Sequence, residues 1–283
     1  MTIENISDTA RWVAVYRAME TERPDGHFRD PYARRLAGER GERIVRTLPR
    51  GTSAAWAMIV RTAVLDEMIL KILARYPVDL VLNLAAGLDT RPYRLPLPAE
   101  LRWVEVDLPG ILEYKRVQMG GETPICRLET VAVDLTDRPA RQALFNRLGA
   151  EARSGLIITE GLLAYLLPEQ VASLASDLHQ PPTFQRWLSD ISSPRLLRLL
   201  QRMYNKQLKA GNAPLVFGPV EGGDFFHPYG WALVEFRSML IEAQRLQREM
   251  PLAWLWRLFN VTKARKEEWR KMSGMIELER REK

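Results

Sequence analysis

The stretch from Val78 to Asp107 constrains the fold more than any other part of the chain. An apolar run, V-D-L-V-L-N-L, ends abruptly at Ala85, Ala86 and Gly87, and a second run, R-W-V-E-V-D, ends at Asp107. In α/β folds, a short buried strand that leads into a turn of small residues brings backbone N–H groups close to a ligand. An acidic residue about 20 positions later, at the end of the next strand, is placed to bind ribose hydroxyls. The region therefore predicts a nucleoside-binding half-site.

Two later segments repeat this pattern. V-A-V-D-L over 131–135 and L-I-I-T-E over 156–160 are short apolar runs that reach a carboxylate, and Gly161 follows the second. Near-continuous apolar runs are typical of strands covered on both faces, as in a parallel sheet, and ligands of such sheets bind outside the carboxyl ends of the strands. The residues that we expect to line one crevice are Gly87, Asp107, Asp134 and Glu160.

The charge of this crevice narrows the class of ligand. Three carboxylates would repel a pyrophosphate but suit a nucleoside that carries a positive charge, of which S-adenosylmethionine is the common example. A nicotinamide-dependent oxidoreductase is a rival on the same kind of sheet. Such an enzyme needs a glycine-rich pyrophosphate turn, and the A-A-G segment supplies one glycine, Gly87.

Four motifs together resemble a known family. N-L-A-A-G-L-D-T-R-P-Y-R-L (83–95) is followed by V-E-V-D-L-P (104–109), V-D-L-T-D (133–137) and I-T-E-G-L-L-A-Y-L (158–166). This series resembles the class I S-adenosylmethionine-dependent methyltransferases related to leucine carboxyl methyltransferase, in particular the bacterial branch of O-methyltransferases of small-molecule pathways. T-A-R-W-V-A-V-Y-R-A and R-D-P-Y-A-R-R-L-A-G, nearer the N-terminus, also resemble that branch, so the similarity runs from about Asp8 to Gln170.

The resemblance implies S-adenosylmethionine as the cofactor and gives individual residues a role. Asp107, followed by Leu108, would hold the ribose hydroxyls, and Gly87 would let the methionine portion approach the backbone. Ala85 departs from the family, which more often has glycine there, and its methyl group should narrow the floor of the pocket. The remaining matches are Asp134 and Leu135, which would flank the adenine, Glu160 and Gly161, near the cofactor, Arg61, which would pair with the methionine carboxylate, and Arg11, near another basic contact.

Arg61 is also singled out by its position in a helix. The spacing predicts a helix from about Ser53 to Tyr76, and Arg61 falls on its apolar face with Val64 and Met68. A buried arginine needs an anionic partner, which is either a ligand carboxylate or an internal salt bridge.

The alternation of strands and helices predicts one α/β domain over 1–283, a doubly wound, mainly parallel seven-stranded sheet of the Rossmann-like methyltransferase type. We expect an N-terminal helical lid (1–52), a cofactor-binding core (53–192), an inserted helical cap (193–229) and C-terminal strands and helices (230–283). The expected helices after the first strand are 88–95, 109–119, 139–148, 168–178, 194–209 and 237–248, and the last strands are 184–191, 230–236 and 275–279.

The sequence says less about the residues that would bind and activate the methyl acceptor. A carboxylate acceptor needs no general base at pH 7, whereas a hydroxyl acceptor does. The candidates for a base are His227, Tyr165 and His27, and the aromatic cluster over 225–229 is a candidate lining of an acceptor pocket. The main hypothesis is methyl transfer to an oxygen of a small molecule. A protein C-terminal carboxyl methyltransferase, or an enzyme of another reaction type on the same fold, stays open.

Composition excludes some classes of protein. One cysteine, Cys126, rules out a disulfide framework and a cysteine-based metal site, and no metal is expected. The net charge is +6, but most of the basic residues lie beside Asp or Glu, which is typical of solvated helix faces and not of a nucleic-acid-binding surface. No apolar run approaches the roughly 18 residues of a membrane span, and the N-terminus is polar. We therefore expect a cytoplasmic protein with a small-molecule substrate and no membrane partner. Whether it forms a homodimer stays open at this point.

Overall fold

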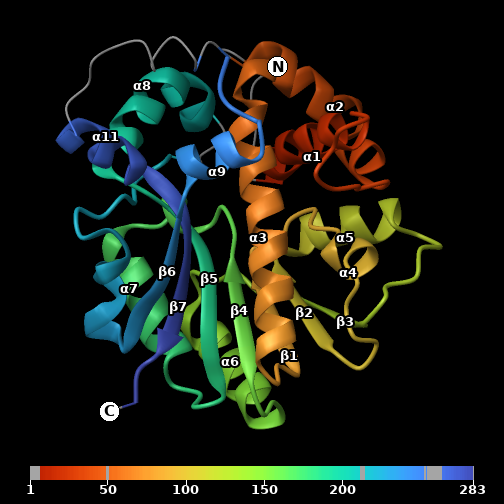
Figure 1. Ribbon diagram of the computed structural model, residues 1–283. Helices are drawn as coiled ribbons and strands as arrows, with labels where there is room; N and C mark the ends of the chain where they lie inside the picture. The colour runs from red at the N-terminus through yellow and green to blue at the C-terminus, as the bar shows by residue number, and fades with distance from the viewer. Residues whose placement is uncertain (1–6, 49–50, 211–213, 252, 254–262, 283) are drawn as a thin grey trace.

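The computed structural model describes residues 7–48, 51–210, 214–251, 253 and 263–282. Its strands are β1 (Leu80–Leu84), β2 (Arg102–Asp107), β3 (Arg127–Ala132), β4 (Gly155–Thr159), β5 (Phe184–Ser192), β6 (Trp231–Ser238) and β7 (Ser273–Arg280). They form one seven-stranded sheet in the order β3-β2-β1-β4-β5-β7-β6. The first five strands pair in parallel, and β7 is antiparallel to both β5 and β6. The predicted doubly wound, mainly parallel sheet is confirmed (Figure 1).

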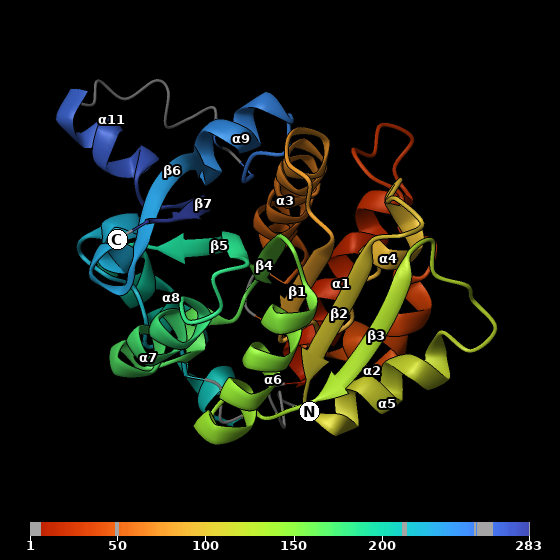
Figure 2. The ribbon, with the colours of Figure 1, turned by 90° about the horizontal axis from the view of Figure 1, so that it is seen from below.

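The helices pack on the two faces of this sheet. The α-helices are α1 (Ser7–Thr21), α2 (Ala33–Thr47), α3 (Ala55–Arg75), α4 (Arg91–Arg94), α5 (Pro109–Gln118), α6 (Arg138–Glu151), α7 (Pro168–Leu178), α8 (Pro194–Ala210), α9 (Met239–Arg245) and α11 (Lys263–Arg270). Short 3₁₀ turns are η1 (Thr52–Ala54), η2 (Leu163–Tyr165) and η3 (Gly222–Tyr229). Figure 2 shows α3 on one side of the sheet and α6 and α7 on the other.

Alternate residues of each strand enter two separate cores. Val81, Leu156 and Ile158 belong to the core that α1 and α3 complete, whereas Leu82 and Ile157 belong to the core under α6 and α7. Side chains of a strand point to opposite faces in turn, so a strand that is apolar at every position is covered on both sides. β1 and β4 are buried along their whole length, as their apolar runs predict.

β3 differs from the predicted strand. The expected strand over 131–135 lies instead at Arg127–Ala132, so that Asp134 and Leu135 fall in the loop after it. β3 is an edge strand with partly exposed residues and not one covered on both faces. The cause is polar pairing that the apolar pattern does not reveal, because Arg102 of β2 donates to Glu129 of β3 at 2.5 Å. Among the helices, α4 has four residues where eight were expected.

The predicted cap over 193–229 does not form one unit. α8 lies at the carboxyl-end edge of the parallel strands, on the same side as α1 and α2 (Figure 1), where Leu200 and Met203 pack against Ile44 of α2. η3 lies at the opposite end of the sheet. It directly precedes Trp231, the first residue of β6, which pairs with Arg280 at the far end of β7.

The predicted aromatic lining over 225–229 is therefore wrong. Phe226 is fully buried and packs against Trp187 and Phe225, with ring centroids 5.0 Å and 5.3 Å apart. Trp231 is also fully buried, and its indole N–H donates to the Ala175 carbonyl at 3.0 Å. These rings build the second core, which is the more common use of aromatic side chains. For Trp254 and Trp256 the sequence favours a core or dimer contact, and both residues lie outside the described residues.

In the described part of the chain, none of the helices combines the length and the apolar character needed to cross a membrane.

Candidate active site

The turn after β1 is held in a special backbone conformation. Ala85 has a φ of 53° and Gly87 also has a φ of 53°, in the left-handed region. The Gly87 N–H donates to Oδ2 of Asp107 at 2.7 Å. A Cβ on Gly87 would lie 3.2 Å from the Cβ of Ala10 on α1, so glycine lets this helix lie close against the turn. The turn is therefore enclosed between the end of β2 and α1.

Asp107 is the last residue of β2, and its carboxylate is fixed by backbone groups. Besides the bond from Gly87, its Oδ1 accepts the N–H of Leu108 at 2.7 Å. Burial raises the pKa of Asp107, although the two N–H groups act in the opposite direction. The structure thus brings Gly87, Asp107 and Leu108 together, as expected for a ribose site. Their binding role stays a prediction.

The N-terminal segment is anchored to the same turn. Arg17 of α1 donates from Nη2 to the carbonyl of Leu88 at 2.5 Å and from Nε to Asp30 at 2.8 Å. Asp30 in turn accepts the hydroxyl of Thr90 at 2.7 Å. α1 and the loop after it therefore lie against the turn, and their role as a lid stays a prediction.

Arg61 and Glu160 are in direct contact. Arg61 is 8% exposed on α3, and its Nε donates to Oε1 of Glu160, the residue after β4, at 2.9 Å. Its Nη1 lies 3.3 Å from Oδ2 of Asp190 near the end of β5. Of the two partners considered for this buried arginine, the structure shows the internal salt bridge. A ligand carboxylate stays a proposal.

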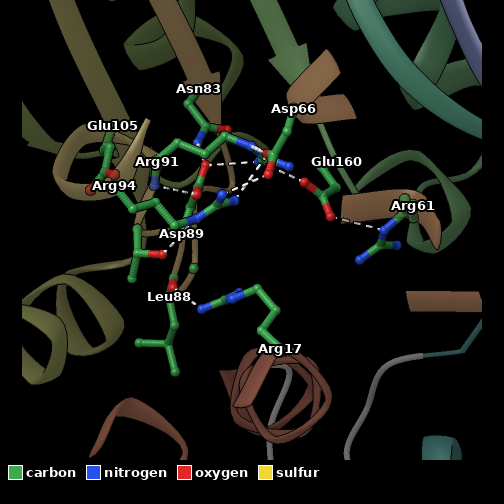
Figure 3. A network of polar contacts seen from close by, with 12 residues as sticks. Arg17, Arg61, Asp66, Asn83, Leu88, Asp89, Arg91, Arg94, Glu105 and Glu160 are labelled. Atoms are coloured by element: carbon green, nitrogen blue, oxygen red, sulfur yellow. Dashed lines mark hydrogen bonds and ion pairs between the residues drawn. The ribbon is translucent and has the colours of Figure 1, made fainter. Parts of the chain in front are cut away.

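Arg91 extends this ion pair into a larger network (Figure 3). Its side chain is 2% exposed, and it donates from Nε to Asp66 at 2.6 Å and from Nη1 to Asp89 at 3.0 Å. Nη1 also donates to Oε2 of Glu160 at 2.7 Å. Arg94 donates to both oxygens of Asp66, at 2.6 Å and 2.9 Å. We call this set the charge network; its members are Arg61, Asp66, Asp89, Arg91, Arg94, Glu160 and Asp190.

The charge network keeps the carboxylates of Glu160 and Asp89 ionised. Burial acts to raise the pKa of Glu160, but Arg91 and Arg61 outweigh it, so the pKa lies below the ordinary value. For Asp89, Arg91 and more distant cations likewise overcome burial, and the pKa is strongly lowered. The segment D-T-R-P-Y-R contains Asp89, Arg91 and Arg94 of this network. Spacing in the sequence does not connect Arg91 with Asp66, 25 positions away, or Arg61 with Asp190, 129 positions away.

Tyr165 lies beside this network. It belongs to η2 after β4, it bonds with Thr9 of α1, and it lies within electrostatic range of Arg61 and Asp190. Burial raises the pKa of Tyr165, and the nearby Arg61 only partly offsets this. The neighbouring Gly161 N–H donates to Oδ1 of Asp190 at 2.6 Å. Tyr165 and Gly161 therefore lie beside the ion pair of Arg61 and Glu160. Asp190 lies there too, and the sequence analysis did not identify it.

Three further expected cofactor residues make other contacts within the protein, and their binding role stays a prediction. Asp134 is exposed and accepts the N–H and the hydroxyl of Thr136 at 2.8 Å and 2.7 Å, which caps its own turn. The Leu135 carbonyl accepts Arg141 at 2.8 Å, and this residue lines a cavity of about 230 Å³ beside α6 and α7. Arg11 lies over the ring of Tyr114 on α5, 3.5 Å from the ring centroid. No contact of these three residues with the charge network is seen in the described part of the chain.

The two histidine candidates contact residues outside the charge network. His227 is in η3 at the opposite end of the sheet, where it contacts Arg281 beyond β7. His27 contacts the Leu246 carbonyl at 2.6 Å through Nε2. The prediction of His227 as a general base is therefore wrong, because a base must reach the proton that it removes. Within the described residues, no cluster of His, Cys, Asp and Glu is arranged to hold a metal ion.

The sheet order, with five parallel strands and β7 antiparallel between β5 and β6, defines the Rossmann-like methyltransferase class of fold. Two solved structures are similar over nearly the whole chain. A DUF574 family protein from Streptomyces avermitilis has a TM-score of 0.62 with 14% identity and covers 97% of both chains. A "putative methyltransferase" from Thermobifida fusca also has a TM-score of 0.62, with 15% identity, and covers 99% of this chain and 96% of its own. At these identities the likeness concerns the fold.

The sequence identifies the family. Residues 10–179 match the model of the leucine carboxyl methyltransferase family, and the chain belongs to that family. A relative from Mycolicibacterium smegmatis, named "Putative S-adenosyl-L-methionine-dependent methyltransferase", is 33% identical over 195 residues. A protein with a name of the same kind from Streptomyces coelicolor is 36% identical over 182 residues. These matches cover 62% and 59% of this chain and span 63% and 61% of the relatives' own lengths.

Ala85→Gly should stabilise the protein by about 1 kcal/mol. An L-residue in the left-handed region costs roughly 1–2 kcal/mol, and the greater freedom of glycine in the unfolded chain cancels only part of that gain. The free energy of unfolding in urea measures the change. Ala86→Gly is the matched control, since Ala86 is not among the residues with positive φ and should lose stability. A loss of stability in Ala85→Gly would contradict the backbone assignment.

Glu160→Gln should lower stability at neutral pH and become nearly neutral in acid. The folded pKa of Glu160 lies below the ordinary value of 4.5, so its contribution to stability is present above pH 4.5 and is lost as the pH falls through the folded pKa. The stability gap between wild type and Glu160→Gln should therefore shrink as the pH is lowered from about 5 towards 2.5. Thermal unfolding across this range measures the gap. A gap independent of pH would mean that Glu160 is not held as a carboxylate by the arginines.

Proposed function

We propose that this protein binds S-adenosylmethionine at the carboxyl edge of the sheet and transfers its methyl group to an oxygen, a carboxylate or a hydroxyl, of a small molecule. Family membership and the names of the relatives support the cofactor and the reaction class. The resemblance to the bacterial branch of the family supports a small-molecule acceptor.

The observation that carries the proposal is the pairing of two different sites on one edge. Asp107 and the Gly87 turn can accept a ribose and let a ligand approach the backbone. The charge network joins α3, the segments after β1 and β4 and the end of β5 on the same edge, and it offers both cations and carboxylates. A ligand with a nucleoside at one end and an amino acid at the other would satisfy both sites.

The balance of charge agrees with this ligand. The charge network contains four carboxylates and three guanidinium groups, so it carries one negative charge in excess. S-adenosylmethionine has a sulfonium, an ammonium and one carboxylate, and is therefore a net cation. Opposite charges in a partly buried site attract more strongly than they do in water.

The chain's own residues would orient the reactants and exclude water. When bound, S-adenosylmethionine supplies an already activated methyl group. Arg61 can pair with an anionic group, and Asp107 can accept hydrogen bonds from hydroxyls. α1 covers the turn after β1 and would limit access of water. Alignment and exclusion of water are the main contributions that an in-line displacement needs.

Tyr165 would act as a hydrogen-bond donor and not as a base. Because burial raises its pKa, the phenol stays protonated at neutral pH. A carboxylate acceptor fits this arrangement without further help, whereas a hydroxyl acceptor would have to find its base elsewhere.

Asp107→Ala should weaken binding of S-adenosylmethionine and S-adenosylhomocysteine alike, by roughly 1.5–3 kcal/mol, the usual range for hydrogen bonds to a charged group. Isothermal titration calorimetry measures both affinities. Asp224→Ala, an exposed carboxylate in η3 at the other end of the sheet, is the control and should bind as wild type. Unchanged affinity in Asp107→Ala would remove the ribose assignment, and no binding to wild-type protein would remove the proposed function.

A further inference from the structure

Arg91 is the most deeply buried arginine of the charge network. Its side chain is 2% exposed, compared with 9% for Arg61 and 4% for Arg94. A guanidinium group at that depth keeps its charge only because carboxylates surround it. Solvent and a ligand have little access to it. Any effect of Arg91 on a ligand must therefore pass through its neighbours.

Glu160 is the neighbour that connects Arg91 with Arg61. Its Oε2 accepts Nη1 of Arg91 at 2.7 Å, and its Oε1 accepts Nε of Arg61 at 2.9 Å. The carboxylate is thus shared, one oxygen for each arginine. Among the described residues, the other ion-pair partner of Arg61 is Asp190, at the longer distance of 3.3 Å. The direction in which Arg61 points depends mainly on how Glu160 is held.

Arg91 itself is fixed from the other side. Asp66 of α3 accepts its Nε at 2.6 Å, and Asp89, which also accepts Asn83 of β1 at 2.8 Å, accepts its Nη1 at 3.0 Å. Asp89 further accepts the backbone N–H of Arg91 at 2.9 Å. Three carboxylates from three parts of the chain therefore meet on one planar group. Arginine suits this position, because its donors point in fixed directions, whereas lysine is a compact point charge.

We propose that Arg91 is a positioning residue for the amino-acid end of the cofactor: it orients Glu160, and through Glu160 the guanidinium of Arg61, without touching the ligand. This inference rests on the proposed function and adds a residue to it. Glu160 would keep Arg61 directed towards the crevice, and Asp66 and Asp89 would keep Arg91 in register with Glu160.

The test compares two ligands that differ only at that end. S-adenosylhomocysteine has the nucleoside, the sulfur and an amino-acid group, whereas 5′-methylthioadenosine has the nucleoside and the sulfur but neither carboxylate nor ammonium. Arg91→Lys should weaken S-adenosylhomocysteine about tenfold or more, as expected for a disturbed hydrogen bond between charged groups. It should leave the affinity for 5′-methylthioadenosine within about twofold. Calorimetry or ligand-observed NMR gives both dissociation constants.

Arg186→Lys is the matched control. Arg186 is also buried, 6% exposed, and is paired with two carboxylates, Glu277 at 2.5 Å and Glu279 at 2.9 Å. It lies near the amino end of β5, away from the crevice, and pairs with Glu279 across to β7. This variant should lose stability without changing the ratio of the two affinities. A purely structural role of Arg91 would make Arg91→Lys behave in the same way, and that result would overturn the inference.

A double-mutant cycle provides a second test, which also serves if Arg91→Lys folds poorly. Glu160→Gln keeps the shape of the side chain and removes its charge. If Arg91 acts through Glu160, then Arg91→Lys combined with Glu160→Gln should weaken S-adenosylhomocysteine no more than Glu160→Gln alone. Additive losses would contradict the pathway. Failure of wild-type protein to bind either ligand would instead count against the proposed function, so the two failures are distinguishable.

Discussion

The salt bridge that Glu160 makes with both Arg61 and Arg91 is the interaction on which the crevice depends. It joins α3, the segment after β1 and the end of β4, and Asp190 extends it to β5. Buried ion pairs contribute little net stability, because removing charges from water costs about as much as their attraction returns. Their effect here is geometric, since each charge can remain in the interior only while its partners stay in place. The arrangement fixes α3, the segment after β1, the end of β4 and β5 against one another at the carboxyl edge of the sheet.

The same edge is closed from outside by the N-terminal segment. α1 lies against Gly87, and Arg17 bonds to the carbonyl of Leu88. The strain at Ala85 is local to this turn, where the backbone adopts a left-handed conformation in a residue that carries a Cβ. Unfavourable backbone conformations persist where the surrounding contacts fix them, and they concentrate at functional sites. The turn, the end of β2 and α1 therefore form one enclosed surface that can hold a nucleoside.

The sequence predicts the elements that hydrophobic periodicity determines and the residues that lie at the ends of the strands. The strands at Arg102–Asp107 and Phe184–Ser192 and the helix Pro168–Leu178 lie where the apolar pattern and the prolines predicted them. Gly87 and Asp107 meet because consecutive parallel strands end at one edge. The edge strand β3 was misplaced, since a strand with one neighbour needs fewer apolar residues. The aromatic residues of η3 were misassigned, because nothing local shows which end of the sheet a late segment reaches.

The long-range ion pairs could not be predicted from the sequence, because local patterns do not show which distant residues meet in the fold. Asp66, Glu160 and Asp190 are distant in the chain, and carboxylates on helix faces or strand ends look alike until the fold brings them to a cation. Arg61 was identified because a charge on an apolar helix face is unusual. Its partner was left open between a ligand and an internal acid, and the fold supplies the acid.

The most direct test of the account is a crystal structure of the protein with S-adenosylhomocysteine bound. We expect the ribose hydroxyls to lie within hydrogen-bond distance of Asp107 and the amino-acid end to lie beside Arg61, with the Glu160 bridge to Arg91 intact. A ligand bound in the reverse direction, or outside the carboxyl edge of the sheet, would contradict it.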